Sequence, residues 1–220
     1  MNLNKYIDHT LLKQDATQEM IAKLCKEAVK YDFKTVCINP SWIVECKKYL
    51  KDSDVKICTV IGFPLGAMTT EAKAFEAKQA VDLGADEVDM VINIGRLKSN
   101  DFDFVVDDIR TVKQAIGNKV LKVIIETCLL TDEEKYLACD AIIEAGADFV
   151  KTSTGFSVSG ATFDDVKILK TGSKGILKVK AAGGVKTFED MKKMIEAGAD
   201  RIGTSSGVAL ISNQRSTDNY

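Results

Sequence analysis

Two lysines stand at the ends of mainly apolar segments, where the charged form of lysine is costly. Lys151 follows the segment 147–150 and Lys180 follows the segment 176–179, and a turn containing glycine comes after each. Both segments predict short buried strands, in which lysine is rare and burial disfavours the ammonium form. Two confined ammonium groups also repel, so we expect at least one of them to have a pKa far below the usual value of about 10.4. A neutral lysine amine can attack a carbonyl carbon and form a Schiff base.

The strand period decides which way these lysines point. Alternate side chains share one face of a strand, so Lys151 points opposite to Val150, and Lys180 points opposite to Val179. If the two valines face covering helices, both lysines enter the inner side of the sheet. Lys178, lower on its strand, is expected to be structural. The competing interpretation is that both lysines reach solvent at the mouth of the sheet and stay protonated.

Three carboxylates interrupt other apolar runs and supply candidate partners for the lysines. Asp89 lies within the run 87–92, Glu126 lies near the end of another run, and Asp8 lies on the first predicted strand. A buried carboxylate needs a partner, and we expect inward-facing lysines to provide it. The pattern leaves two roles open for each, an acid–base group or one half of a structural ion pair.

Two glycine-rich turns predict an anion site. The turn 183–187 precedes a predicted helix, and the turn 203–207 precedes the last short helix. Backbone N–H groups at two helix N-termini could therefore point at one phosphate. Gly155 offers a third approach that no side chain obstructs, and Lys186 could add positive charge.

Composition excludes several other classes of protein. The 30 basic and 32 acidic residues are well mixed and give a net charge of −2, so neither nucleic acid nor a membrane surface is an expected partner. No secretory signal or membrane-spanning stretch is visible. The six cysteines form no C-x-x-C pair and fit the core of a reduced, cytoplasmic protein. We expect small-molecule partners.

The single histidine, His9, limits metal chemistry. A zinc site of the three-histidine type cannot be built, and a catalytic triad would have to use this one residue. An all-carboxylate magnesium site stays formally open, although no paired-acid motif at helical spacing supports it. We therefore expect neither a metal nor another cofactor.

The elements that position these residues follow a repeated pattern. Segments 83–88, 145–150 and 197–202 each join the glycine that ends a helix to an apolar strand. Helices are predicted to start at threonines with capping potential, Thr17, Thr70, Thr131, Thr162 and Thr187. Eight strands are predicted, over residues 6–10, 35–39, 56–63, 87–94, 120–127, 147–152, 177–181 and 201–204.

Eight strands alternating with helices predict an α/β fold, a single (β/α)8 TIM barrel over residues 1–210, followed by a short flexible tail over 211–220. An open doubly wound sheet is the main competitor, but no G-x-G-x-x-G follows the first strand. Glycines gather instead after the last three strands, where barrels often bind phosphate. In either fold the function is expected at the carboxyl ends of the strands.

These residues resemble one known family over the whole chain. The sequence is similar to the deoxyribose-phosphate aldolases, which are class I, Schiff-base aldolases. The motifs that carry the resemblance are Asp-His-Thr-Leu-Leu at 8–12, Val-Ile-Gly-Phe-Pro-Leu-Gly at 60–66, Glu-Val-Asp-Met-Val-Ile-Asn at 87–93, Lys-Val-Ile-Ile-Glu-Thr at 122–127, Phe-Val-Lys-Thr-Ser-Thr-Gly at 149–155 and Lys-Ala-Ala-Gly-Gly-Val at 180–185.

The resemblance implies a carbon–carbon lyase that reversibly cleaves 2-deoxy-D-ribose 5-phosphate to acetaldehyde and D-glyceraldehyde 3-phosphate, in deoxyribonucleotide breakdown. It implies that Lys151 is the Schiff-base nucleophile, that Lys180 is the cation that lowers its pKa, and that Asp89 moves protons together with water. Substrate and phosphate contacts are expected from Gly155, Gly183, Gly184, Gly203, Ser205, Ser206, Thr154, Lys186 and Asp8.

The resemblance also assigns the last residue. Many members end in a tyrosine that takes part in proton transfer at the enamine carbon, and this chain ends in Tyr220. Some members carry a lysine where this chain has Phe156, so a phosphate contact there is lost or is taken over by Lys186. Two other functions stay open, a Schiff-base aldolase of the transaldolase or keto-acid type and a non-catalytic phosphate-binding barrel. The sequence does not decide between a homodimer and a homotetramer.

Overall fold

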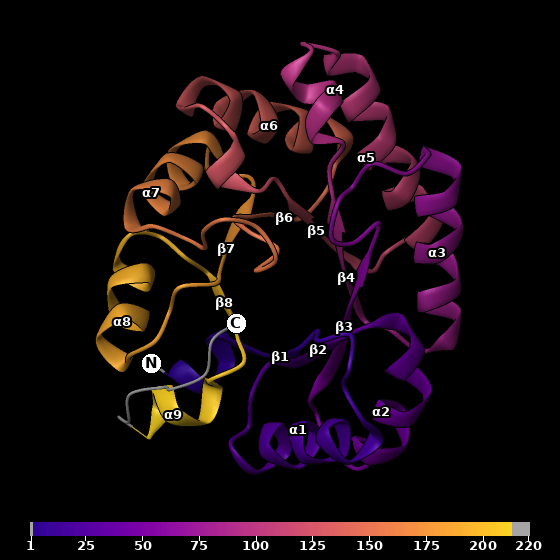
Figure 1. Ribbon diagram of the computed structural model, residues 1–220, viewed down its shortest axis with the longest axis vertical. Helices are drawn as coiled ribbons and strands as arrows, with labels where there is room; N and C mark the ends of the chain where they lie inside the picture. The colour runs from indigo at the N-terminus through magenta and orange to yellow at the C-terminus, as the bar shows by residue number, and fades with distance from the viewer. Residues whose placement is uncertain (1, 213–220) are drawn as a thin grey trace.

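Eight parallel strands close into one barrel, and each strand pairs with the next one along the chain. This computed structural model describes residues 2–212 (Figure 1). The predicted TIM barrel is therefore confirmed. The strands are β1 (Ile7–Leu11), β2 (Thr35–Ile38), β3 (Lys56–Ile61), β4 (Glu87–Val91), β5 (Val120–Ile124), β6 (Phe149–Lys151), β7 (Lys178–Ala182) and β8 (Arg201–Thr204).

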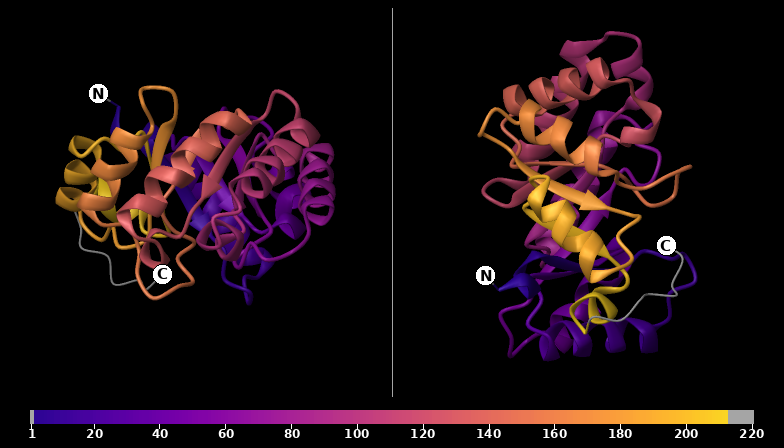
Figure 2. Two further views of the ribbon diagram at one scale, coloured as in Figure 1. Left: turned by 90° about the horizontal axis from the view of Figure 1, so that it is seen from above. Right: turned by 90° about the vertical axis from the view of Figure 1, so that its left-hand side faces the viewer.

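Helices surround the barrel on its outside (Figures 1 and 2). They are α1 (Gln18–Lys30), α2 (Ile43–Tyr49), α3 (Thr70–Leu83), α4 (Ile94–Lys98), α5 (Phe102–Ile116), α6 (Asp132–Ala145), α7 (Phe163–Gly172), α8 (Phe188–Glu196) and α9 (Gly207–Ile211). Three short 3-10 helices lie at Leu3–Tyr6, Pro40–Trp42 and Thr127–Leu129.

The predicted helix starts are confirmed at threonines that cap the first turn. The side chains of Thr17, Thr131, Thr162 and Thr187 each accept a hydrogen bond from a backbone N–H of the helix they precede. Helix α3 begins at Thr70 as predicted, although its capping hydroxyl belongs to Thr69. These starts could be predicted because a cap is a local hydrogen bond.

Two predicted strands extended three residues too far at their carboxyl ends. The segment predicted to reach residue 94 stops at Val91, because Ile94 already begins α4 behind its cap Asn93. The segment predicted to reach residue 127 stops at Ile124, because Glu126 takes a left-handed conformation. Both early ends belong to strands that carry candidate site residues.

The main apolar core lies between the strands and the helices. Val150 and Val179 are fully buried in this layer, and so Lys151 and Lys180 point into the barrel. The direction predicted from the strand period is confirmed.

The predicted tail, residues 211–220, begins at the end of helix α9. Helix α9 continues to Ile211, one residue beyond the predicted end of the barrel domain. Residues 213–220, including Tyr220, lie outside the described residues. Within 2–212, none of the helices combines the length and the apolar character that crossing a bilayer would require.

Candidate active site

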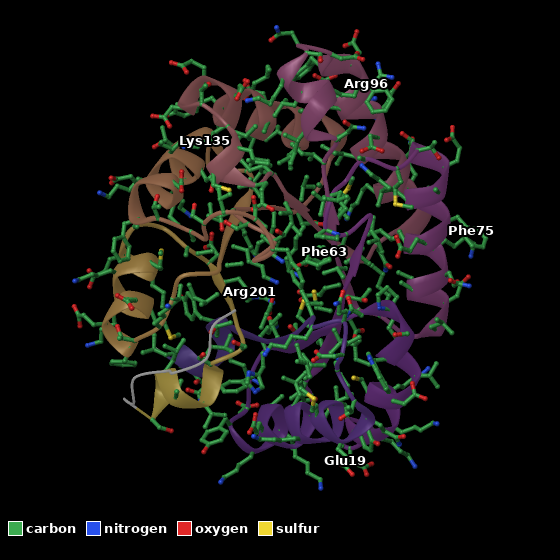
Figure 3. The ribbon with its side chains drawn as sticks, viewed as in Figure 1. Glu19, Phe63, Phe75, Arg96, Lys135 and Arg201 are labelled. Carbon is green, nitrogen blue, oxygen red and sulfur yellow. The ribbon has the colours of Figure 1, made fainter. Side chains whose placement is uncertain are left out.

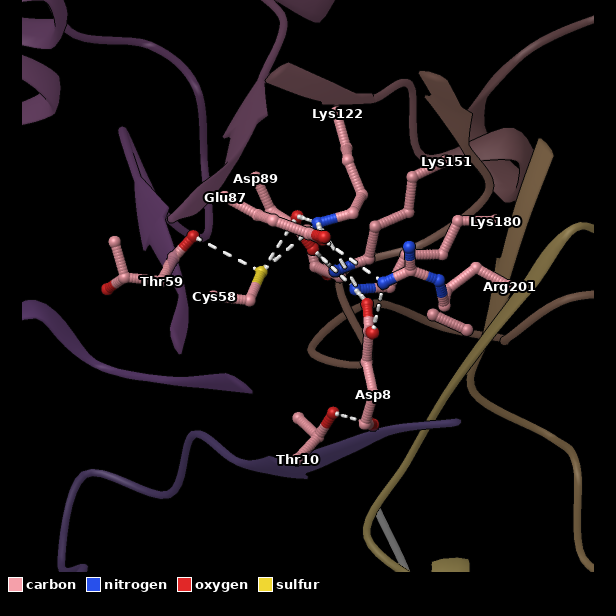
Figure 4. Close-up of polar contacts among 12 residues, drawn as sticks. Asp8, Thr10, Cys58, Thr59, Glu87, Asp89, Lys122, Lys151, Lys180 and Arg201 are labelled. Atoms are coloured by element: carbon pink, nitrogen blue, oxygen red, sulfur yellow. Dashed lines mark hydrogen bonds and ion pairs between the residues drawn. The ribbon is translucent and has the colours of Figure 1, made fainter. Parts of the chain in front are cut away.

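Seven charged side chains meet inside the barrel (Figure 4). They come from six strands and are buried or nearly so: Asp8 on β1, Glu87 and Asp89 on β4, Lys122 on β5, Lys151 on β6, Lys180 on β7 and Arg201 on β8. Four are cations and three are carboxylates. Ion pairs in such surroundings are little screened by water, so their arrangement governs where protons reside.

Asp89 contacts both Lys151 and Lys180. Lys151 and Lys180 are partners in the register of β6 and β7, so they enter the barrel side by side. The Nζ atoms of both lysines lie 2.8 Å from the same oxygen, Oδ2 of Asp89. The structure therefore brings together the three residues that were expected to carry the chemistry.

Lys180 is held more tightly than Lys151. Its Nζ lies 2.5 Å from Oδ2 of Asp8 in addition to its contact with Asp89. Burial acts to lower the pKa of Lys180, but the carboxylates of Asp8 and Asp89 outweigh it and raise that pKa well above its usual value. The expected repulsion therefore does not make Lys180 a neutral amine, and Lys180 is the permanent cation of the pair.

Asp89 is held in its ionised form. Burial alone would raise its pKa, but the ammonium groups of Lys122, Lys151 and Lys180 hold the pKa of Asp89 well below its usual range. An ionised carboxylate accepts protons. Asp89 can therefore donate a proton only after it has taken one from a neighbour or from the substrate.

Asp8 bonds to two cations of the cluster. It is fully buried, with Oδ2 on Lys180 and Oδ1 2.6 Å from Nη1 of Arg201. Burial opposes ionisation, but Arg201 and then Lys180 and Lys122 hold the pKa of Asp8 well below its usual range. This geometry gives Asp8 the role of a support for Lys180, which is one of the two roles left open by the sequence.

Three charged members of the cluster were missed by the sequence analysis. The Nζ of Lys122 lies 2.6 Å from Oε2 of Glu87 and 2.9 Å from Oδ1 of Asp89, and Nη1 of Arg201 lies 3.1 Å from the same Glu87 oxygen. Glu87 and Asp89 are spaced by two residues on β4, which places both side chains inside. The sequence did carry a signal for these residues: charged residues two positions apart, on strands predicted to be buried, point to the same inner face.

A cysteine completes the surroundings of Asp89. The thiol of Cys58 donates to Oδ1 of Asp89 over 3.1 Å and accepts from Nζ of Lys122 over 3.3 Å, and Cys58 also packs in an apolar cluster with Cys37 and Phe63. The donor atoms of Cys37, Cys58 and Asp89 lie within 4.8 Å of one another, which is a geometry that a metal ion could use. Lysine ammonium groups already donate to this carboxylate, so we expect them to repel a cation.

The glycine turns after β6 and β7 lie against each other. The N–H of Ala161, from the loop after β6, donates to the carbonyl oxygens of Ala182 and Gly183 at 3.1 Å each. Gly183 and Gly184 have φ values of +75° and +80°, which favour glycine. The turn after β7 therefore has a shape that side chains would disturb.

Some of the N–H groups expected to meet a phosphate at the N-terminus of α8 are bonded within the protein. The N–H groups of Lys186 and Thr187 donate to Oδ2 of Asp190, and the N–H of Asp190 donates to the Thr187 hydroxyl. These donors are already bonded within the helix cap. An anion at this turn would depend on Gly183, Gly184 and the exposed side chain of Lys186.

The turn after β8 lies beside a cavity of about 240 Å³. Ser205 lines it together with His9 and Lys13. Ser206 is buried, and its N–H donates to the hydroxyl of Thr204 over 3.0 Å. Gly203 leaves room for the side chain of Lys180, because a Cβ added at Gly203 would lie 3.1 Å from Cε of Lys180.

Glu126 does not have the partner that was predicted for it. Among residues 2–212 it forms no ion pair with a lysine, and its carboxylate accepts hydrogen bonds from Thr154 instead. The hydroxyl of Thr154 donates to Glu126 and accepts from the N–H of Phe156. Thr154 therefore uses its hydroxyl within the protein.

Comparison with known proteins agrees with this geometry. Residues 3–213 match the DeoC/LacD family of aldolases. The chain belongs to the DeoC/LacD aldolase family. It is 58% identical to deoxyribose-phosphate aldolase 1 of Mesoplasma florum over the full length of both chains. It is also 58% identical to the deoxyribose-phosphate aldolase of Brevibacillus brevis, over 99% of this chain and 98% of the relative.

Solved structures of DeoC/LacD-type aldolases share the fold closely. A putative deoxyribose-phosphate aldolase from Coccidioides immitis superimposes with a TM-score of 0.94 at 41% identity, covering 96% of this chain and 85% of the other. A deoxyribose-phosphate aldolase from Aeropyrum pernix, described as a unique tetramer, gives a TM-score of 0.87 at 36% identity, with coverage of 96% and 89%. The resemblance found in the sequence is thus confirmed.

Proposed function

We propose that this chain reversibly cleaves 2-deoxy-D-ribose 5-phosphate to acetaldehyde and D-glyceraldehyde 3-phosphate through a Schiff base on Lys151. Full-length relatives named deoxyribose-phosphate aldolase support this substrate. The observation that carries the mechanism is the shared carboxylate oxygen of Asp89, which lies 2.8 Å from the Nζ atoms of both Lys151 and Lys180.

The charge count of the cluster favours Lys151 as the nucleophile. With every group ionised, four cations face three carboxylates, so the release of one proton makes the cluster electrically neutral. Among residues 2–212, Lys180 and Arg201 each contact two carboxylates and Lys122 contacts three, whereas Lys151 contacts only Asp89. Lys151 is therefore the ammonium group whose proton is held by the fewest partners.

The bond changes follow from the chemistry of an iminium ion. The neutral amine of Lys151 adds to C1 of the open-chain sugar, and loss of water gives the iminium. The C2–C3 bond then breaks, its electron pair moves toward the iminium nitrogen, and the C3 hydroxyl loses its proton as glyceraldehyde 3-phosphate forms. The remaining enamine is protonated at C2, and hydrolysis releases acetaldehyde and Lys151.

Proton transfer in these steps is assigned to Asp89. Its ionised carboxylate accepts a proton, directly or through water, and returns it when the carbinolamine loses water. Lys180 stays charged between Asp8 and Asp89 and favours the neutral form of its neighbour Lys151. Tyr220, which lies outside the described residues, is proposed to protonate C2, and removal of this one residue should slow deuterium exchange at C2 of acetaldehyde.

The phosphate group is proposed to bind at the turns after the last three strands. The backbone of these turns, rather than the capped N-terminus of α8, supplies the contacts. The proposed contacts are Thr154, Gly155, Gly183, Gly184, Lys186, Gly203, Ser205 and Ser206.

Two further properties are part of the proposal. A homodimer or homotetramer is supported by the tetramer described for the Aeropyrum pernix relative. Phe75 on α3 is 70% exposed and points away from the barrel (Figure 3). Light scattering at several protein concentrations tests the assembly.

The six unpaired cysteines support a reducing compartment, the cytoplasm.

Borohydride reduction tests the mechanism directly. In the presence of acetaldehyde, reduction should attach an ethyl group to Lys151, and peptide mapping should find it there and not on Lys180. Lys151→Arg should abolish the modification. Pyruvate or dihydroxyacetone in place of acetaldehyde should give little adduct, which separates this activity from other Schiff-base aldolases. An unmodified Lys151 in the folded protein would overturn the proposal.

A further inference from the structure

Glu126 has an unusual backbone conformation for its residue type. It follows β5 with φ 54° and ψ 67°, in the left-handed region that favours glycine. Such a conformation costs free energy and persists only where the surrounding structure holds it. Within residues 2–212, the other non-glycine residues with positive φ are Asp32, Asn100 and Lys174, and none of these three is buried.

The side chain of Glu126 is also unusual. Only 3% of the residue is exposed, and no cation pairs with it among residues 2–212. Its carboxylate accepts from the N–H of Thr154, at 3.2 Å and 3.4 Å to its two oxygens, and from the Thr154 hydroxyl. A buried carboxylate without a cation depends on such hydrogen bonds.

The amide groups on either side of Glu126 bond to the segment that carries the nucleophile. The N–H of Ile125 donates to the carbonyl oxygen of Lys151 over 3.0 Å, and the N–H of Thr127 donates to that of Thr152 over 2.9 Å. The left-handed residue between them lets its side chain turn to Thr154 while both neighbours keep these bonds. Backbone and side chain of this short segment therefore hold Lys151 at the end of β6 and Thr152 and Thr154 in the loop after it.

The bonds continue from Thr154 toward the expected phosphate contact. The hydroxyl that donates to Glu126 accepts from the N–H of Phe156 over 3.0 Å, which closes a tight turn around Gly155. Gly155 itself has φ +85°. The position of its backbone is thus fixed by a hydrogen-bond chain that begins at the Glu126 carboxylate.

We propose that Glu126 is a positioning residue that shapes the phosphate-binding turn 152–156. It acts through Thr154 and touches neither the reacting atoms nor the phosphate, and the proposal rests on the function proposed above. A carboxylate suits the task because both of its oxygens only accept, whereas a glutamine would present an NH₂ group to the donors of Thr154.

Substrates with and without phosphate provide the test. In Glu126→Gln, the KM for 2-deoxy-D-ribose 5-phosphate should rise about tenfold or more, the effect expected when a charge-assisted bond is lost. The kcat/KM for unphosphorylated 2-deoxy-D-ribose should change less than about twofold, because that substrate does not use the turn. Thr154→Val removes the hydroxyl bonds to Glu126 and Phe156, leaves the backbone N–H of residue 154 in place, and should give the same split. The double variant should be no worse than either single one.

Two controls make the result specific. Asn100→Gly relieves a left-handed residue in the exposed turn between α4 and α5, and it should change neither kinetic constant. Glu126→Gly relieves the backbone strain but lacks the carboxylate, so it should show the same rise in KM as Glu126→Gln. If Glu126→Gln does not fold, Thr154→Val and Glu126→Gly carry the comparison.

The outcomes separate this inference from the proposed function. An equal loss with both sugars, or an unchanged KM for the phosphorylated sugar, would overturn the role of Glu126. Borohydride labelling of Lys151 by acetaldehyde needs no phosphate and should persist in every Glu126 variant. Loss of labelling in the wild-type protein would instead overturn the Schiff-base mechanism. The role of Glu126 would then be tested by the binding of inorganic phosphate, which Glu126→Gln should weaken about tenfold.

Discussion

Lys151 and Lys180 occupy partner positions on neighbouring strands, and their ammonium nitrogens lie at the same distance, 2.8 Å, from one carboxylate oxygen. They nevertheless differ in their other contacts. Lys180 has Asp8 as a second partner and Lys151 has none of this kind among the described residues. We propose that this difference makes Lys180 the permanent cation and Lys151 the group that reacts.

Replacing Lys180 with methionine tests that division. Lys180→Met removes the neighbouring charge, so Lys151 should hold its proton more firmly and kcat at neutral pH should fall at least about 100-fold. The rise of the pH–rate profile should move to higher pH. Lys178→Met, two residues earlier on the same strand and exposed, is the matched control and should behave like the wild type. An unchanged profile in Lys180→Met would contradict the assignment.

The buried carboxylates should make the barrel sensitive to acid. The pKa values of Asp8 and Asp89 are lower in the folded protein than in the unfolded chain, where an aspartate has a pKa of about 3.9. Their contribution to stability is therefore complete above about pH 4 and is lost as the pH falls below that value. Urea unfolding between pH 5 and pH 2.5 should show this loss. Asp8→Asn should be less stable at pH 7 but show a shallower decline, and an equal decline would contradict the argument.

Gly203 should be intolerant of a side chain for a reason other than its backbone. An added carbon would lie 3.1 Å from Cε of Lys180 and 3.2 Å from Cβ of Ala182, and the φ of Gly203 is not positive. Gly203→Ala should displace Lys180 and lower kcat about tenfold or more, with a loss of stability of only about 1 kcal/mol. Steady-state kinetics and thermal unfolding check the two parts. Gly117→Ala is a stability control, since nothing lies near its added carbon and its cost should come from φ +60° alone.

A second buried ion pair should serve stability rather than chemistry. Lys73 on α3 is fully buried, with Nζ 2.6 Å from Oδ2 of Asp108 and 3.0 Å from the carbonyl oxygen of Val91. Burial outweighs the attraction of Asp108 and lowers the pKa of Lys73. Lys73→Met leaves the carboxylate unpaired, so the free energy of unfolding should fall by about 3–5 kcal/mol. Lys73→Met combined with Asp108→Leu should recover part of that loss in urea unfolding. If nothing is recovered, lost packing rather than the unpaired charge causes the fall in the free energy of unfolding.

Sequence periodicity was sufficient for the features that depend on one element at a time. The threonine caps, the eight strands and the inward direction of Lys151 and Lys180 each follow from the spacing of neighbouring residues. The spacing could not say which carboxylate each lysine would meet. That choice depends on barrel closure, as in the contact between Asp8 and Arg201, which are 193 residues apart.

Backbone turns account for the remaining errors. The prediction for Glu126 assumed that β5 continued in the strand conformation, which would have sent its side chain toward the lysines. The left-handed turn at Glu126 sends it to Thr154 instead. The capped start of α8 similarly uses N–H groups that a helix start would otherwise offer to an anion, because Asp190 reaches back to Thr187.

The ionic interior of the barrel has a consequence for its behaviour on heating. Hydration of charged groups becomes less favourable as temperature rises, so the cost of keeping these ions away from water decreases when the protein warms. The stabilisation from the apolar layer between the strands and the helices does not increase in this way with temperature. We therefore expect that the cluster of charged residues stays assembled up to the temperature at which the surrounding helices unfold, and that heat abolishes activity and structure together.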